Sequence, residues 1–312
     1  MSITDMDTIH VRILRSDPES GEAPHYEAYE VPGSPHMRVL DVLEYIQETL
    51  VQDVAFRWLC SVKRCGSCAV TVNGSPVLAC WEAAQPEMTI EPLKNLPVIR
   101  DLVIDRDPYQ DTLAKLDPLL VRKEPYAGFP EPMSEADAAP GVHLRDCIQC
   151  LAGRAVCPVL EQPDSGFAGP APLVALAELA LDPRDGADRA ALAEDVAGVF
   201  KCVSCYECER VCPSEIPIVT DAIEPLKRLA TRRGEGDGAR HARAFLDVVK
   251  TYGKVNASRL MLRSKGVSAA RLRTGLRMMA SGKVDLADSL LKRPPAEAKK
   301  LRRIYDSAEE DE

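Results

Sequence analysis

Residues 60–80 read CSVKRCGSCAVTVNGSPVLAC, and three of their four cysteines follow the spacing C-x4-C-x2-C. That spacing, with a further cysteine downstream, is typical of plant-type [2Fe–2S] sites, where a tight loop wraps three thiolates around the cluster. Gly66 lets backbone N–H groups approach sulfur, and such hydrogen bonds tune the reduction potential. The fourth thiolate returns on the far strand of a hairpin. The predicted ligands of this first site are Cys60, Cys65, Cys68 and Cys80.

The residues around this loop predict a small β-rich domain. Alternating strands are expected at residues 10–14 and 26–31, and the apolar spacing of residues 41–50 predicts a helix. Asn-Gly at 73–74, between two apolar stretches, predicts a hairpin. Strand, strand, helix and hairpin together indicate a β-grasp ferredoxin domain over residues 1–110. Four buried free thiols and a zinc site are the alternatives, but zinc knuckles usually show two CxxC pairs.

Two further cysteine runs follow the bacterial ferredoxin motif. Residues 202–213, CVSCYECERVCP, contain the complete motif, whereas residues 147–158, CIQCLAGRAVCP, have Gly153 where the third cysteine belongs. In two-cluster folds the fourth cysteine of each run binds the other cluster. This rule predicts one set of ligands, Cys157, Cys202, Cys205 and Cys208, for a [4Fe–4S] cluster, and a second set of Cys147, Cys150 and Cys212.

The second set lacks a cysteine for a fourth iron. It is expected to hold a [3Fe–4S] cluster, or a [4Fe–4S] cluster in which water, a nearby side chain or a substrate binds one iron. A thiol from elsewhere is not expected, because the three sets use all eleven cysteines of the chain. The odd count also excludes a complete disulfide framework. The alternative for Gly153 is a sequence variant without functional meaning.

Composition and charge limit the class of protein. The chain has 312 residues, 46% of them hydrophobic and 28% charged, which predicts a packed core. There is no run of 18 apolar residues, and residues 1–7 are acidic without an apolar signal stretch, so a cytoplasmic location is expected. Residues 1–220 carry 18 Lys/Arg against 35 Asp/Glu, whereas residues 221–312 carry 21 against 13. The basic tail suggests a partner or an anionic membrane surface; the alternative is a solvated helical surface.

The rest of the chain is expected to be helical, which makes the fold class α+β. Prolines punctuate residues 106–140, which therefore look like a connection between domains. Residues 111–225 are expected to form an all-α, bacterial-ferredoxin-like domain, with Ala/Leu-rich helices at 171–181 and 187–200. Residues 226–312 are expected to form a basic helical C-terminal extension.

Several functions are not indicated by the sequence. It contains no dinucleotide-binding fingerprint and no nucleophile with an adjacent base, so the chain is not expected to bind flavin or to supply a catalytic residue. The basic tail has no nucleic-acid-binding motif and few aromatic residues, so nucleic acid is not an expected partner.

Residues 8–220 resemble the iron–sulfur subunits of succinate dehydrogenase and fumarate reductase. The resemblance covers about two-thirds of the chain and includes all three cysteine sets. The other shared stretches are DPESGE at 17–22, VLDVL at 39–43, AFR at 55–57, CGSCA at 65–69, VNG at 72–74 and IEPLKNLPVIRDLVID at 90–105.

The resemblance implies an N-terminal ferredoxin domain, a helical ferredoxin domain and a flavoprotein partner whose FAD oxidises succinate or reduces fumarate. It also implies that three clusters relay electrons between that flavin and a quinone in a membrane-anchor subunit. The chain would then lie on the inner face of the cell membrane through its partner subunits. In this family the [2Fe–2S] site is nearest the flavin and the last ferredoxin-type site nearest the exit.

Several positions depart from the usual pattern of the family. Cys205 stands where a non-cysteine is usual, so the exit site is expected to be [4Fe–4S], whereas Gly153 removes a ligand from the middle site. Variants with such a cysteine resemble the branch with a cysteine-rich, heterodisulfide-reductase-like membrane subunit. Val203 replaces an expected histidine, and residues 159–163 lack an expected tryptophan, so a standard ubiquinone pocket is not expected.

The C-terminal region and the function each leave alternatives. Residues 239–305, through the stretches 243–253 and 273–279, look like the end of heterodisulfide-reductase C-type subunits and are expected to dock a partner or cap the helical domain. One alternative function is an electron-transfer subunit of a different flavoprotein oxidoreductase or heterodisulfide-reductase-like complex. The other is an iron–sulfur sensor or assembly scaffold that uses the open middle site.

Overall fold

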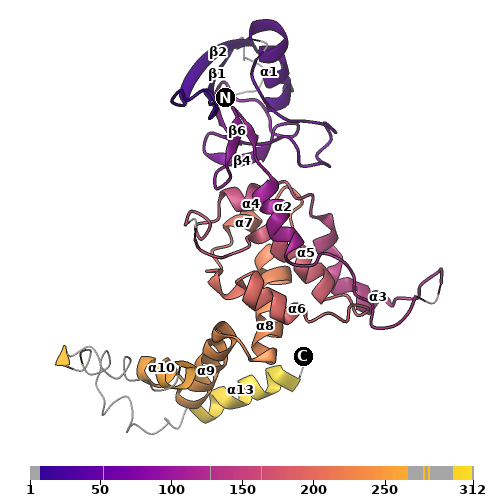
Figure 1. Ribbon diagram of the computed structural model, residues 1–312, viewed down its shortest axis with the longest axis vertical. Coiled ribbons are helices and arrows are strands. Elements are labelled where there is room, and N and C mark those ends of the chain that lie inside the picture. Colours follow the sequence, from indigo (N-terminus) through magenta and orange to yellow (C-terminus); the bar gives the residue numbers. More distant parts are fainter. Residues whose placement is uncertain are drawn as a thin grey trace. The chain divides into compact units, whose positions relative to one another are not determined.

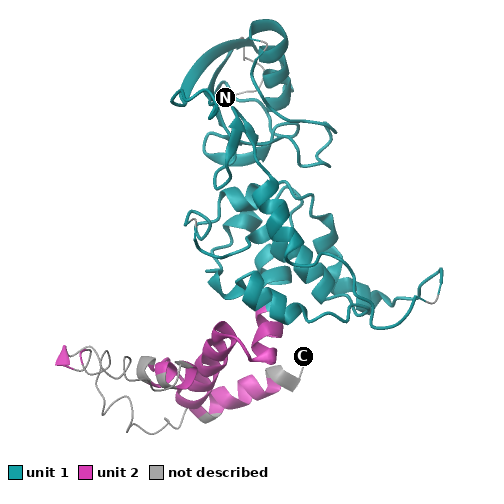
Figure 2. Cartoon of the chain, viewed as in Figure 1, with its two compact units in different colours: residues 1–226 teal, residues 227–312 magenta. Residues whose placement is uncertain are grey.

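Apart from helix α1 (Val39–Tyr45), which follows the second strand, the chain forms strands first and helices afterwards (Figure 1). In the computed structural model it divides into two compact units, residues 1–226 and 227–312 (Figure 2). This order of elements is the predicted α+β class, whereas the three predicted domain boundaries stay predictions. The structure describes residues 8–265 except 52, 127 and 163, residues 277, 280 and 281, and residues 298–310.

A five-stranded mixed sheet opens the first unit. Its strands are β1 (Thr8–Arg15), β2 (His25–Pro32), β3 (Ala69–Val72), β4 (Ser75–Leu78) and β5 (Glu87–Glu91). Their order is β2-β1-β5-β3-β4, and β1 runs parallel to β5 while the other pairs are antiparallel. The two predicted strands and the hairpin are confirmed. Strand β5 was not predicted, although Met88 and Ile90 alternate with polar residues there.

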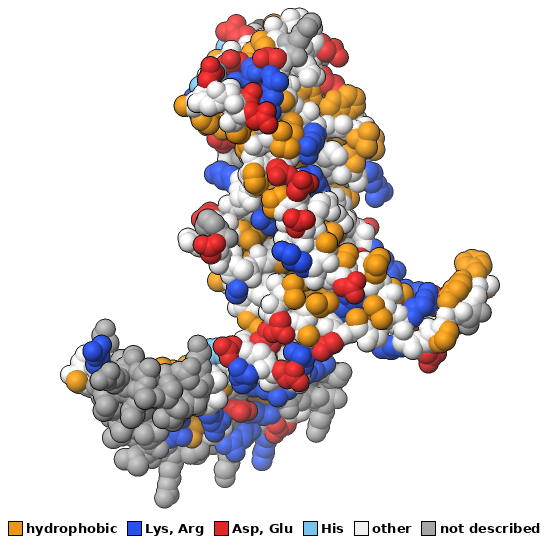
Figure 3. All heavy atoms as spheres, in the orientation of Figure 1, with side chains coloured by type: hydrophobic (Ala, Val, Ile, Leu, Met, Phe, Trp, Pro, Cys, Tyr) orange, Lys and Arg blue, Asp and Glu red, His pale blue; other side chains and the backbone are white. Residues whose placement is uncertain are grey.

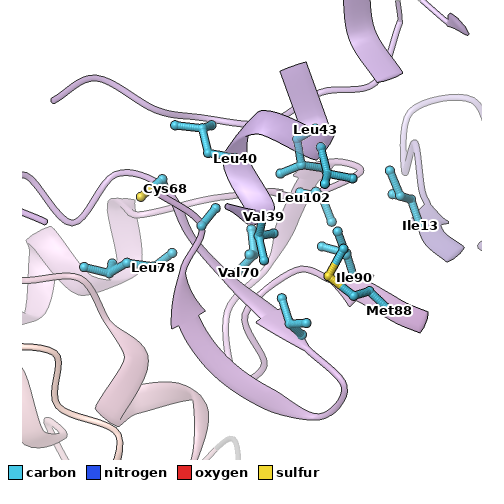
Figure 4. Close-up of a cluster of buried hydrophobic side chains, with 14 of the residues drawn as sticks. Ile13, Val39, Leu40, Leu43, Cys68, Val70, Leu78, Met88, Ile90 and Leu102 are labelled. Carbon is cyan, nitrogen blue, oxygen red and sulfur yellow. The ribbon is translucent and has the colours of Figure 1, made fainter. Parts of the chain in front are cut away.

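The core of this part lies between the sheet and one helix. Helix α1 (Val39–Tyr45) continues into a π-helical turn, Ile46–Leu50, so the predicted helix is present and starts two residues early. Figure 4 shows Val39 and Leu43 of α1 beside Val70 and Ile90 of the sheet, and all four are buried. Cys68 and Leu78 belong to the same buried cluster. The hydrophobic core therefore holds the end of the first cysteine loop.

Short elements connect the sheet to the helical part. A two-stranded ladder pairs β6 (Val98–Arg100) with β7 (Val103–Ile104), and helix α2 follows at Asp107–Ala114. The connecting region ends in α3 (Glu135–Ala138) and 3₁₀ turns at Ala139–Gly141 and His143–Asp146.

Short helices make up the rest of the first unit. They are α4 (Ala152–Ala155), α5 (Pro170–Ala180), α6 (Arg189–Ala191), α7 (Glu207–Arg210), a π-helical segment at Ile218–Ile223 and α8 (Glu224–Arg233), which crosses the unit boundary. The predicted helix at 171–181 is confirmed as α5. The single helix predicted at 187–200 is wrong, because α6 passes into a π turn, Leu192–Val196, and then Gly198 adopts φ 62°. That left-handed residue ends the helical path.

The second unit is helical where it is described. It contains α9 (Asp237–Tyr252), α10 (Ala257–Lys265) and α13 (Ala298–Glu310). Lys250 of α9 pairs with Asp306 of α13 at 2.8 Å. Lys and Arg side chains gather on the face of this unit that Figure 3 shows. The sequence stretch 273–279 lies outside the described residues apart from Arg277. Among the described residues, none of the helices has both the length and the apolar character that crossing a bilayer requires.

A buried carboxylate ties the sheet to the segment before the first cysteine loop. Asp101 accepts hydrogen bonds from the backbone N–H groups of Ala55, at 2.9 Å, and Ser16, at 3.1 Å. The guanidinium of Arg15, at the end of β1, donates to the same carboxylate at 3.0 Å. The two side chains are only 10% and 3% exposed. Asp101 therefore fixes the chain direction just before the loop.

We predict that Asp101→Ala lowers the free energy of unfolding by about 3 kcal/mol, because it removes one partner of a buried ion pair and leaves two N–H groups unsatisfied. Urea denaturation of the protein purified without oxygen measures this change. The control is Glu30→Ala, which removes an exposed carboxylate 3.8 Å from His10 and is expected to change stability by less than about 0.5 kcal/mol. Equal stability of the two variants would contradict the role of Asp101.

Candidate functional site

The first cysteine loop directs backbone N–H groups at one sulfur. Cys60 Sγ accepts three hydrogen bonds at 3.3–3.5 Å, from the N–H groups of Val62, Arg64 and Cys65. Positive φ angles fold the loop into this concave arrangement, at Ser61 (55°), Lys63 (59°) and Gly66 (69°). The N–H donors lower the pKa of Cys60 to about 7. The loop is therefore built to stabilise a thiolate, the form that binds iron.

The other thiols of this loop lie close to one another. Cys68 and Cys80 are buried, on the two sides of the hairpin. Burial raises the pKa of Cys68 to about 12, and the neighbouring Cys80 and Cys65 thiols add to the rise. The Cys65 thiol also shares a hydrogen bond with Cys60. The four thiols predicted as the first set thus form one continuous group.

The second and third cysteine runs fold as two copies of one loop, with Cys147 corresponding to Cys202. Positive φ angles recur at matching positions, Gln149 (51°) with Ser204 (51°) and Leu151 (68°) with Tyr206 (63°). Each copy then enters a single-turn helix, α4 or α7. The N-cap residue is Leu151 in the first helix and Tyr206 in the second. Gly153 and Cys208 occupy equivalent positions in the two copies.

The seven thiols of these runs fall into two groups by the charge interactions between them. Burial raises the pKa of Cys208 to about 12, and the charges of Cys202, Cys205 and Cys157 raise it further. Burial raises the pKa of Cys150 to about 11, the N–H of Ala152 lowers it, and Cys212 and Cys147 raise it. Each group takes its last cysteine from the other run.

A small cavity of about 30 Å³ lies beside the group of three thiols. Its wall includes Cys147, Cys150 and Cys212, together with Gly153 and Cys208 of the neighbouring group. None of the described residues that line it carries a carboxylate or an imidazole. A Cβ atom at Gly153 would lie 3.1 Å from Cys208 Cβ and 3.5 Å from Pro170 Cβ. Gly153, the position in the middle group that lacks a cysteine, therefore packs closely against Cys208 of the neighbouring group.

A second glycine brings the first loop against the middle group. Gly66 has φ 69°, and a Cβ atom there would lie 2.8 Å from the carbonyl oxygen of Ile148 and 2.9 Å from Cys150 Cα. Both the conformation and the close approach require glycine. With the contact between Gly153 and Cys208, the three groups of thiols form an unbroken series through the first unit.

Polar side chains that the sequence analysis missed hold the loops in place. The Asn95 amide donates to the carbonyl oxygens of Arg154, Ala155 and Cys157, at 3.1, 3.3 and 3.3 Å. The Arg106 guanidinium donates to the carbonyl oxygen of Gln149 at 2.8 Å. Asn95 lies in the stretch 90–105 that carried the resemblance, and nothing in its local pattern marks it as a contact to α4.

The donor sets fit clusters in which thiolates bind different irons. All eleven cysteines lie in the three groups, and backbone N–H groups point at Cys60, as sulfur ligands require. Within the described parts of the chain, no three His, Cys, Asp or Glu side chains are arranged to hold a single metal ion. The ligand assignment of each cysteine stays a prediction.

Two family models match this chain. A 2Fe-2S iron-sulfur cluster binding domain covers residues 10–111, and a 4Fe-4S dicluster domain covers residues 143–216. The sheet with its cysteine loop and the paired ferredoxin loops therefore define an iron–sulfur protein with a 2Fe-2S and a 4Fe-4S dicluster domain.

Known relatives narrow this class. The chain is 38% identical over 228 residues to a fumarate reductase (CoM/CoB) subunit of Methanothermobacter marburgensis, covering 73% of this chain and 45% of the relative. It is 36% identical over 221 residues to the fumarate reductase iron-sulfur subunit of Mycobacterium tuberculosis, covering 68% and 88%. A chain of the Mycobacterium smegmatis Sdh1 complex in the apo form matches with a TM-score of 0.68 and 29% identity, over 74% of this chain and 99% of that one.

These matches show the family. The chain belongs to the iron–sulfur subunits of succinate dehydrogenase and fumarate reductase. It spans less than half the length of several curated relatives that it matches, the Methanothermobacter protein among them.

The contact at Gly66 generates one prediction. Gly66→Ala is expected to lower the content of the [2Fe–2S] cluster and slow electron transfer from it, because the methyl group would force the loop away from Cys150. Gly74→Ala is the control, since Gly74 has φ 83° but a Cβ atom there meets nothing within 4 Å. Iron analysis and rapid-freeze EPR measure both variants. Equal behaviour of the two would show that backbone conformation alone, and not the contact, matters.

The closed corner at Gly153 generates another prediction. Gly153→Cys adds a thiol to the middle group and is expected to convert a [3Fe–4S] EPR signal into that of a reducible [4Fe–4S] cluster. Gly153→Ala is the matched control, because its methyl group meets the same 3.1 Å contact with Cys208 without adding a ligand. If the cysteine variant keeps the spectrum of the alanine variant, the ligand assignment of the middle group is wrong.

Proposed function

We propose that this chain is the iron–sulfur electron-transfer subunit of a succinate dehydrogenase or fumarate reductase complex. The observation that carries the proposal is the unbroken series of three thiol groups, joined where Gly66 meets Cys150 and Gly153 meets Cys208. When bound, iron–sulfur clusters supply one-electron transfer. The chain positions them, excludes water and directs N–H groups at sulfur. It is thus a non-flavin subunit of an oxidoreductase, with no catalytic residue of its own.

The finer assignment of fold and ligands belongs to the same proposal. The strand order β2-β1-β5-β3-β4 supports a β-grasp ferredoxin domain, and the paired loops support a bacterial-ferredoxin-like helical domain. The thiol neighbours support three ligand sets. These are Cys60, Cys65, Cys68 and Cys80 for [2Fe–2S]; Cys157, Cys202, Cys205 and Cys208 for [4Fe–4S]; and Cys147, Cys150 and Cys212 for the middle cluster.

The middle cluster has three cysteine ligands in this proposal. A [3Fe–4S] cluster matches that donor set, and a [4Fe–4S] cluster would need a non-cysteine ligand at one iron. Among the described residues, the lining of the cavity offers neither a carboxylate nor an imidazole for a fourth iron, although it includes the Ser214 hydroxyl and the Cys208 thiol. The close packing of Gly153 on Cys208 also leaves little room for a bound molecule at that corner.

Exposed apolar side chains around the first loop support a protein partner there. Leu59, Val62 and Trp81 are 74%, 61% and 52% exposed. The Lys63 ammonium lies 5.3 Å from the centre of the Trp81 ring, so basic and aromatic groups share this surface. Large exposed apolar side chains of this kind mark interaction sites. We assign the surface to the flavoprotein subunit, which carries the FAD.

The third thiol group also reaches the surface. Cys205 is exposed, and the adjacent Val203 and Tyr206 are 65% and 46% exposed. We assign this end of the series to a membrane-anchor or cysteine-rich, heterodisulfide-reductase-like subunit that passes electrons to a quinone. In this arrangement the chain is peripheral on the inner face of the cell membrane.

A second candidate function shares the same clusters. The chain would then serve a different flavoprotein oxidoreductase or a heterodisulfide-reductase-like complex. Two observations favour it: Cys205 completes the third thiol group, and one relative is a fumarate reductase named for CoM and CoB. Only the electron donor and acceptor distinguish the two candidates.

The test uses the complex purified without oxygen from its native source. Succinate is expected to reduce the [2Fe–2S] EPR signal rapidly, or fumarate to reoxidise the dithionite-reduced complex, depending on the physiological direction. Malonate, a competitive dicarboxylate, serves as the control and is expected to block both. Clusters that respond to dithionite but to neither dicarboxylate would overturn the succinate–fumarate assignment and favour the second candidate.

A further inference from the structure

One buried hydroxyl beside the middle thiol group has no partner. Tyr109, in the first turns of α2, is completely buried. Among the residues that the structure describes, no atom forms a hydrogen bond with its hydroxyl. A buried polar group without a partner is destabilising, and native proteins seldom retain one without a ligand, ion or water to pair it. The hydroxyl is therefore available to a partner that the described residues do not supply.

Contacts place the start of α2 on the loop that carries two thiols of the middle group. Arg106, which precedes α2, donates to the carbonyl oxygen of Gln149 at 2.8 Å, between Cys147 and Cys150. Its guanidinium carbon lies 5.8 Å from the centre of the Tyr109 ring. Tyr109 also belongs to the same buried cluster as Cys150. Arg106 thus links the Tyr109 ring to this loop.

Electrostatics agrees with this placement. Burial raises the pKa of Tyr109 to about 12, the negative charge of Cys147 raises it further, Arg106 lowers it and Cys150 raises it. A phenol hydroxyl is a hydrogen-bond donor, and a thiolate or sulfide has no proton to donate in return. Sulfur atoms of iron–sulfur clusters accept such hydrogen bonds, which shift the reduction potential.

We propose that the Tyr109 hydroxyl donates a hydrogen bond to a sulfur atom of the middle cluster, on the side of Cys147 and Cys150, and raises the reduction potential of that cluster. A donated hydrogen bond stabilises the reduced state more, because that state carries the greater negative charge. This inference rests on the proposed ligand set of the middle cluster. It does not depend on succinate or fumarate as the substrate.

The geometry favours a donor over a fourth iron ligand. The corner that lacks a cysteine faces Gly153, whose nearest neighbours are Cys208 and Pro170. Tyr109 is absent from the described residues that line the cavity at that corner. Arg106, whose guanidinium lies over the Tyr109 ring, binds the loop between Cys147 and Cys150. Tyr109 therefore approaches the cluster from another side.

The experiment compares Tyr109→Phe with the unchanged complex in an EPR redox titration with mediators. We expect the reduction equilibrium constant of the middle cluster to fall about tenfold, which is about 59 mV for one electron. The potentials of the other two clusters and the iron content are expected to stay unchanged. The control is Tyr126→Phe, which removes a hydroxyl from a side chain that is 55% exposed.

Two outcomes would overturn the proposal. An unchanged middle potential with the cluster retained would exclude the hydrogen bond, and a change in the number of irons would make Tyr109 a ligand. If Tyr109→Phe fails to assemble, 3-fluorotyrosine at position 109 supplies a stronger donor of the same shape. It is expected to raise the middle potential, and no rise would count against the bond. The redox titration uses mediators and no succinate or fumarate. Its result is therefore independent of the test of the proposed function.

Discussion

Backbone N–H groups aimed at sulfur are the interaction on which the first unit depends. Directing three of them at Cys60 requires positive φ angles within one short loop, and residues with a Cβ atom adopt such angles at a cost. The hydrophobic core offsets that cost, because Cys68 and Leu78 are buried with α1 and the sheet. Asp101 fixes the approach to the loop through Ala55. The sheet and its core therefore hold the first cysteine loop in a conformation that is unfavourable for an isolated segment.

Close packing between loops is the second constraint. The first loop touches the middle thiol group at Gly66, and the middle group touches the third at Gly153, so side chains are absent where the loops meet. Asn95 and Arg106 bind backbone carbonyls from across these junctions. This arrangement keeps successive thiol groups near one another, as the proposed electron transfer demands. It also explains why the two cluster-binding regions form one compact unit.

Local signals in the sequence predicted much of this protein, and long-range contacts escaped prediction. The spacing of the cysteines predicted the three thiol groups. Asn-Gly predicted the hairpin, and alternating apolar and polar residues predicted two strands. The helix predicted at 187–200 failed because a left-handed Gly198 overrides an Ala-rich pattern. The contacts of Gly66 and Asn95 depend on residues about 60 to 80 positions away, and no local periodicity encodes such pairings. The partner subunits were predicted from the family resemblance, because the fold of this chain alone does not indicate them.

The paired ferredoxin loops give this molecule an internal reference. Gln149 and Leu151 repeat the backbone angles of Ser204 and Tyr206, yet one copy has lost a thiol at Gly153. Two loops with a common main-chain path and an unequal number of cysteines therefore coexist in a single chain, in the same solvent and at the same temperature. Any contrast between them in oxygen sensitivity or iron loss reflects side-chain chemistry and not the path of the main chain.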